Sequence, residues 1–163
     1  MLAAWAEARR DGEELVVAGL AEAAWLARGA KASVAGVRFA GMLSRAEYRG
    51  LLRRARVFVT APRREDYGIA QLEALADGCV LVTTPSPGPY AALPLARALD
   101  SRLVGDDLAG AIRVALDDPA PGYAERAAET LQPWRRDEVD RVVATELLPR
   151  LLRGGGAPSP RVG

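Results

Sequence analysis

Histidine is absent from the 163-residue chain, and cysteine occurs only at Cys79. Without histidine the chain cannot form a Ser-His-Asp triad, a histidine metal site or a histidine acid–base pair. A single cysteine excludes an internal disulfide framework and a cysteine metal cluster. Because Cys79 begins an apolar strand-like run, we interpret it as a buried structural thiol. Any catalysis must therefore use carboxylates, Lys, Arg, Tyr, backbone amides or the substrate itself.

Long apolar runs and an excess of one charge are also lacking. No run approaches the roughly 18 residues expected of a membrane-spanning helix, and residues 1–11 lack the apolar core and cleavage site of a signal peptide. We therefore expect a cytoplasmic protein. Lys and Arg number 22 and Asp and Glu number 21, which gives a net charge of +1. That balance does not favour electrostatic binding of nucleic acid.

The usual nucleotide-binding loops are missing as well. No strand-like run is followed by G-x-G-x-x-G, and no G-x-x-x-x-G-K-[ST] loop occurs. Lys31, the sole lysine, falls between a predicted helix and a predicted strand. A ligand with phosphate groups would have to be held by other means.

Apolar strand-like runs alternate with helical periods along the chain. Strands are predicted at 14–19, 34–39, 57–60, 79–84 and 102–104. Helices are predicted at 1–10, 20–28, 44–55, 69–77, 90–99, 108–116, 123–131 and 134–152. This alternation predicts an α/β domain over residues 1–152, a Rossmann-like parallel sheet of about five strands with helices on both faces. Residues 153–163 are rich in Gly and Pro and are predicted to be a disordered tail.

Three helix starts carry recognisable local signals. Ser44 and Glu47 have the spacing of a capping box. Pro89 is well placed as a first helical residue, and Asp106 or Asp107 is predicted to cap the helix that follows.

The stretch from Arg63 to Gly78 places two carboxylates, Glu65 and Glu73, around a loop-to-helix junction at Gly68. A strand is predicted on each side of it, and helix starts at this position of an α/β protein bind anions. The amides of Gly68, Ile69 and Ala70 would point at such an anion. Acids around an anion site indicate a ligand that carries both phosphates and hydroxyls.

Each of these features also has a structural explanation. Glu73 lies on an otherwise apolar helix and could pair with an arginine such as Arg56 or Arg64. Glu65 could be a surface loop acid, and Gly68 a turn residue. The loop 85–89 could face the same site or be a plain connector.

These residues resemble the donor-binding motif of retaining glycosyltransferases of the GT-B fold, family four (glycosyl transferases group 1). The family pattern is Glu, any residue, an aromatic, Gly, a second Glu eight positions after the first, Ala and a later Gly. Here Glu65, Tyr67, Gly68, Glu73, Ala74 and Gly78 fill those positions. The flanking strands 16–19, 37–41 and 57–59 and the position of Trp134 are similar too, so the resemblance runs from about Leu15 to Leu152.

The resemblance implies a role for each residue. Glu65 would approach the transferred sugar as the catalytic carboxylate, and Glu73 would bind the ribose hydroxyls of a nucleotide-diphospho-sugar. The amides of Gly68, Ile69 and Ala70 after Tyr67 would contact the diphosphate, and Gly88 would correspond to a glycine of the second loop. No metal and no cofactor are expected. The acceptor is unknown, and peripheral membrane association of the full-length enzyme stays open.

The chain departs from the family pattern at three places. The family's diphosphate-binding Arg and Lys lie on a first strand and loop, and this chain is expected to begin in the helix after them, with the acceptor-binding N-terminal half missing. Asp66 replaces a small residue, and the loop after Thr84 lacks Gly-Gly-x-Pro-Glu. We therefore expect an incomplete glycosyltransferase that is inactive alone. The alternatives are a non-catalytic α/β binding module or a fragment of a GT-B nucleotide-sugar epimerase, which would need a different glutamate-rich motif and usually histidine.

Overall fold

A computed structural model describes residues 1–29 and 34–154. Most of the predicted tail at 153–163, and Lys31, therefore lie outside the described residues. Contacts divide the chain into two compact units, Met1–Ala128 and Glu129–Gly163. The predicted site lies wholly in the first unit.

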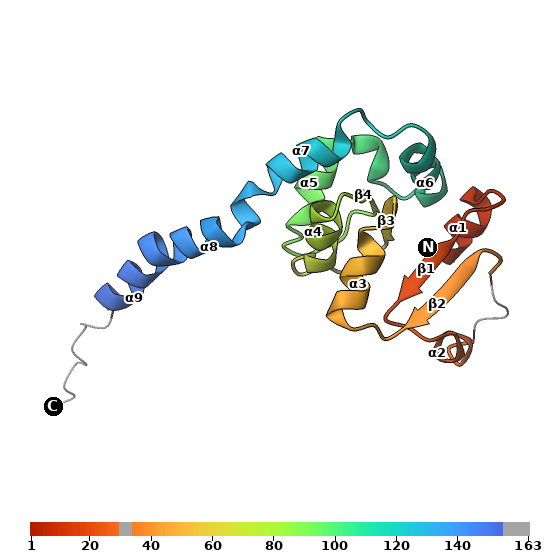
Figure 1. Cartoon of the computed structure of the whole chain (residues 1–163), viewed down its shortest axis with the longest axis horizontal. Helices are drawn as coiled ribbons and strands as arrows, with labels where there is room; N and C mark the ends of the chain where they lie inside the picture. The colour runs from red at the N-terminus through yellow and green to blue at the C-terminus, as the bar shows by residue number, and fades with distance from the viewer. Residues whose placement is uncertain (30–33, 155–163) are drawn as a thin grey trace. The chain divides into compact units, whose positions relative to one another are not determined.

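Helices and short strands alternate through the first unit, as the sequence predicts (Figure 1). The strands are β1 (Leu15–Ala18), β2 (Val37–Gly41), β3 (Val57–Thr60) and β4 (Val80–Thr83). The helices are α1 (Leu2–Ala8), α2 (Glu22–Leu26), α3 (Arg45–Leu52), α4 (Ile69–Ala76), α5 (Ala92–Leu99), α6 (Leu108–Asp117) and α7 (Tyr123–Thr130), the last of which crosses into the second unit. This arrangement fits a Rossmann-like α/β fold.

The four strands form two separate parallel pairs instead of one sheet of about five strands. β1 pairs with β2 from Leu15 opposite Val37, and β3 pairs with β4 from Val57 opposite Val80 (Figure 1). The prediction of a single five-stranded sheet is therefore wrong for the described residues.

The predicted fifth strand at 102–104 is a 3-10 turn, η1 (Ser101–Leu103). Only an isolated parallel bridge joins Thr83 to Val104. The Asp100 side chain accepts hydrogen bonds from the backbone amide and the guanidinium of Arg102, at 3.1 and 3.0 Å. These local bonds hold the segment in a turn, because a side chain that binds its own backbone competes with strand pairing.

The core of the first unit is built around β4, whose four residues are all buried. Leu75, Leu81, Val82 and Leu103 are its largest fully buried apolar side chains. Cys79 is fully buried in a cluster with Leu52 and Ala74, with its Sγ 3.2 Å from the Leu52 carbonyl oxygen, and burial raises the pKa of its thiol to about 11. A thiol with that pKa stays protonated and unreactive, in agreement with its predicted structural role.

Two of the three predicted helix starts are confirmed. The capping box at Ser44 and Glu47 is present, and Asp107 caps α6 through the amide of Gly110. α5 begins at Ala92, later than Pro89 predicts. The amide of Ala91, the N-cap of α5, donates to the Tyr67 carbonyl and so joins the start of this helix to the preceding loop.

The second unit is helical but not as one helix over 134–152. It contains a 3-10 turn, η2 (Gln132–Trp134), then α8 (Arg136–Val142), a π-helical segment, η3 (Val143–Leu147), and α9 (Leu148–Gly154). None of the described helices is long and apolar enough to cross a membrane.

Candidate donor-binding site

Two loops of the first unit, at residues 61–68 and 84–91, are joined by backbone hydrogen bonds. The Glu65 amide donates to the Pro87 carbonyl at 3.1 Å, and the Ala91 amide donates to the Tyr67 carbonyl at 3.0 Å. These loops follow β3 and β4, which are parallel neighbours, and so leave the same edge of the pair. The loop containing Gly88 is therefore part of the site's wall.

The two glycines of the site lie where no side chain fits. Gly68 has φ 89°, and a Cβ there would lie 2.8 Å from the Tyr90 ring. Gly88 has φ 112°, and a Cβ there would lie 2.3 Å from the Glu65 carbonyl oxygen. Both positions combine a left-handed backbone with close packing, which explains why glycine occurs at each.

Glu65 is held at the start of α4 and is not a freely moving surface acid. Its Oε1 accepts from the amide of Gly68 at 3.0 Å and of Tyr67 at 3.3 Å, and its Oε2 accepts from Nε2 of Gln71 at 3.0 Å. The carboxylate thus binds the amides of Tyr67 and Gly68, the two residues just before α4, and closes the turn that leads into the helix. The Gly68 amide, predicted to face an anion, already has a protein acceptor.

A buried polar chain continues from Glu65 into the core. Gln71 and Tyr90 hydrogen-bond through their side chains, and the Tyr90 hydroxyl lies 2.9 Å from Oγ1 of Thr83. All three residues are buried, and burial raises the pKa of Tyr90. No sequence pattern predicted that these three side chains would be joined. The only sequence signal was Gln71, a neutral polar residue near the start of an otherwise largely apolar helix.

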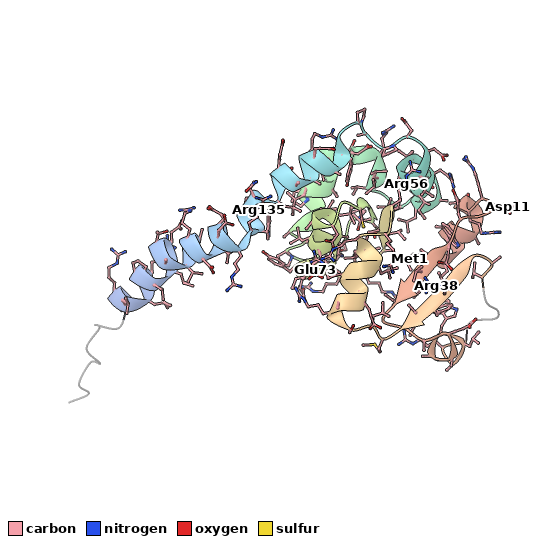
Figure 2. The ribbon with its side chains drawn as sticks, viewed as in Figure 1. Met1, Asp11, Arg38, Arg56, Glu73 and Arg135 are labelled. Atoms are coloured by element: carbon pink, nitrogen blue, oxygen red, sulfur yellow. The ribbon has the colours of Figure 1, made fainter. Side chains whose placement is uncertain are left out.

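Glu73 is paired with arginines, but not with those that were predicted. Its Oε1 lies 3.4 Å from Nη2 of Arg45 and 3.6 Å from Nη1 of Arg49, both on α3, and 21% of its side chain is exposed. Arg64 instead pairs with Asp66, and Arg56 lies elsewhere in the unit (Figure 2). Part of the Glu73 side chain is therefore exposed, and its carboxylate could accept hydrogen bonds from the hydroxyl groups of a ligand.

Arg49 also binds Asp77, the residue after α4, whose side chain is only 7% exposed. Nη2 of Arg49 donates to Oδ1 of Asp77 at 2.7 Å, and the hydrogen bonds to Asp77 are the main cause that raises the pKa of Arg49. This pair ties α3 to the C-terminal end of α4. It fixes the arginine that faces Glu73.

The remaining predicted site residues lie at the open side of the α4 N-terminus. Tyr67 and Ile69 are exposed large side chains, and Ala70 is exposed as well. The first amides of an α-helix lack partners within the helix, so Ile69 and Ala70 present donors next to Glu65. The described residues contain no group of three or more His, Cys, Asp or Glu side chains able to hold a metal ion.

A family model described as glycosyl transferases group 1 matches residues 1–118. The chain belongs to this family. The matched region covers most of the chain and contains both loops of the site, α4 and the buried polar chain. None of the curated proteins matches the chain.

Proposed function

We propose that this glycosyltransferase domain binds a nucleotide-diphospho-sugar at the N-terminus of α4, for retaining transfer of the sugar to an acceptor of unknown identity. The observation that carries the proposal is the placement of Glu65 and Glu73 on either side of the first turn of α4. They lie inside the region that matches the family. Carboxylates next to helix amides suit a ligand with both hydroxyls and phosphates.

The donor's parts would meet different groups. The Glu65 carboxylate would face the transferred sugar, and the accessible oxygen of Glu73 would accept from the ribose hydroxyls. The amides of Ile69 and Ala70 would contact the diphosphate. The amide of Gly68 would do so as well if it gave up its hydrogen bond to Glu65. Amide dipoles at this helix start would stabilise the charge that develops on the departing diphosphate. No metal is needed in this scheme.

We further propose that residues 1–163 bind the donor weakly and transfer no sugar alone. The described site offers one wall, built on α4 and the two loops. A transfer reaction also needs an acceptor-binding wall and compensation for the charge on the diphosphate. Turnover by the purified 163-residue chain would contradict this part of the proposal.

Calorimetry with a panel of UDP-, GDP- and ADP-sugars tests donor binding. We expect one base to be preferred, and we expect Glu73→Ala to abolish that binding. Glu7→Ala, which removes an exposed acid on α1, should leave it unchanged. If no member of the panel binds, a non-catalytic α/β module that kept the fold becomes the better reading.

A further inference from the structure

Ion pairs join α3 to α4, and the two helices lie next to each other in Figure 1. Arg45, Arg49 and Arg53 follow one another at intervals of four residues, which places them along one side of α3 and its C-cap. Glu73 and Asp77 have the same spacing at the end of α4. Glu73 contacts Arg45 and Arg49. Asp77 contacts Arg49 and Arg53, so Arg49 bridges the two acids.

Arg49 uses one edge of its guanidinium for Asp77 and the remaining nitrogen for Glu73. Its Nε lies 2.6 Å from Oδ2 of Asp77, and its Nη2 donates to Oδ1 at 2.7 Å. Its Nη1 lies 3.6 Å from Oε1 of Glu73. Because a guanidinium is planar and rigid, the grip of Asp77 sets the direction in which Nη1 points. An ammonium group, which has no such fork, could not transmit this constraint.

The position of Asp77 is not explained by α4 itself. Asp77 is the C-cap of this helix, and the helix dipole opposes a negative charge at that end. Its side chain is also nearly fully buried, so the carboxylate loses most of its hydration. An acid that is unfavourable for its own helix indicates a role in what it holds, which is the Arg49 side chain.

Arg45 approaches the same oxygen of Glu73 but is held much less firmly. Its Nη2 lies 3.4 Å from Oε1, and 84% of its side chain is exposed. Glu73 is its only acidic partner in the part of the chain that the structure describes. Exposed pairs of this kind contribute little order. Arg49, which is partly buried and bound at its other edge, is therefore better suited to fix the Glu73 carboxylate.

We propose that Asp77 and Arg49 are positioning residues for Glu73, which they hold by Oε1 so that Oε2 faces the neighbouring hydroxyls of the donor's ribose. This inference rests on the proposed function, because it assumes that Glu73 binds the ribose. It adds that discrimination between ribose and 2′-deoxyribose depends on two residues that do not touch the ligand. A carboxylate that is already held loses less conformational freedom when it binds.

Calorimetry on the 163-residue chain tests the inference with UDP, GDP and ADP and with the 2′-deoxy form of each. For the base that binds, we expect the ribonucleotide to bind several-fold more tightly than its 2′-deoxy form. Arg49→Lys and Asp77→Asn should each reduce this ratio of affinities, because they weaken the ribonucleotide more than the 2′-deoxy form. A merely structural defect would weaken both nucleotides alike and leave the ratio unchanged.

Arg53→Lys is the matched control, because Arg53 pairs with Asp77 and, among the described residues, makes no ion pair with Glu73. It should keep the wild-type ratio. Arg45→Gln should change the ratio little, since its contact with Glu73 is exposed. If Asp77 acts through Glu73, Asp77→Asn should cause no further fall of the ratio in a chain that already carries Glu73→Gln. Urea unfolding checks that each variant is folded, and Arg49→Lys remains the test if Asp77→Asn does not fold.

A measurement without nucleotide separates this inference from the proposed function. In NMR spectra of the free chain, the side-chain carboxyl carbon of Glu73 should shift in Arg49→Lys and stay in place in Arg53→Lys. An unmoved resonance in Arg49→Lys would overturn the inference even if nucleotides bind. A wild-type chain that binds both forms equally would overturn it as well, although donor binding would stand. A shifted resonance with no nucleotide bound would support the positioning of Glu73 and refute the proposed function.

Discussion

The Oε1 atom of Glu65 lies 3.0 Å from the backbone nitrogen of Gly68. This carboxylate closes the turn before α4, and in the proposed function it also faces the transferred sugar of the donor. Glu65→Ala should lower the free energy of unfolding by about 1 kcal/mol, because it removes the acceptor of the Tyr67 and Gly68 amides and of the Gln71 side chain. It should also weaken binding of the nucleotide-sugar.

Urea unfolding and calorimetry on the same preparation measure these two effects of Glu65→Ala. Asp66→Ala is the control, because Asp66 is 79% exposed and, among the described residues, forms an ion pair with Arg64 alone. Its effect on stability should stay within about 0.5 kcal/mol. Unchanged stability in Glu65→Ala would show that the hydrogen bonds of this carboxylate contribute nothing.

Gly88 should tolerate no side chain, because a Cβ would lie 2.3 Å from the Glu65 carbonyl oxygen and the backbone is left-handed there. We expect Gly88→Ala to destabilise the protein by about 1–3 kcal/mol and to displace the loop from Glu65. Gly105→Ala is the matched control, since nothing lies within 4 Å of a Cβ at that position. Thermal unfolding of both variants checks the difference, and equal melting temperatures would contradict it.

The local parts of this site were predictable from the sequence, and the non-local parts were not. Spacing alone located Glu65, Gly68 and Glu73 around the start of α4, and the capping box at Ser44 was also confirmed. The arginines that face Glu73 are Arg49 and Arg45 of α3, which lie 24 and 28 residues earlier in the sequence. Nothing in a helical pattern indicates which of several arginines reaches a distant carboxylate.

The parallel direction of the strands was predicted and is confirmed, but their division into two separate pairs was not predictable from the sequence. The apolar runs at β1, β3 and β4 look alike, but only β4 is buried on all sides. The segment after α5 reads as a strand from its apolar residues. It forms a turn because Asp100 binds Arg102 two residues away, and such short-range polar bonds are poorly captured by hydrophobic patterns.

The Tyr90 hydroxyl should stabilise the site through the buried chain that it forms with Gln71 and Thr83. Tyr90→Phe leaves the buried side chains of Gln71 and Thr83 without this hydrogen-bond partner, so we expect the free energy of unfolding to fall by about 1–3 kcal/mol. Tyr48→Phe provides the comparison, because its hydroxyl makes no hydrogen bond within the described parts of the chain. Denaturant midpoints measure both, and a loss in Tyr48→Phe as large as in Tyr90→Phe would refute the assignment.

Acid should destabilise the protein through Asp100. Hydrogen bonds from Arg102, with Nη2 of Arg102 2.8 Å from Oδ2 of Asp100, hold the pKa of this carboxyl below its ordinary value of 3.8. A group whose pKa is lower in the folded state binds protons more readily when unfolded. Its contribution is therefore fully present above about pH 4 and is lost as the pH falls through the folded pKa. Asp100→Asn should lower stability at neutral pH and flatten the fall between neutral pH and about pH 3. Asp11→Asn, at a fully exposed acid, should keep the wild-type pH profile. Urea unfolding across this range measures the slopes, and parallel profiles for wild type and Asp100→Asn would show that other carboxylates cause the acid sensitivity.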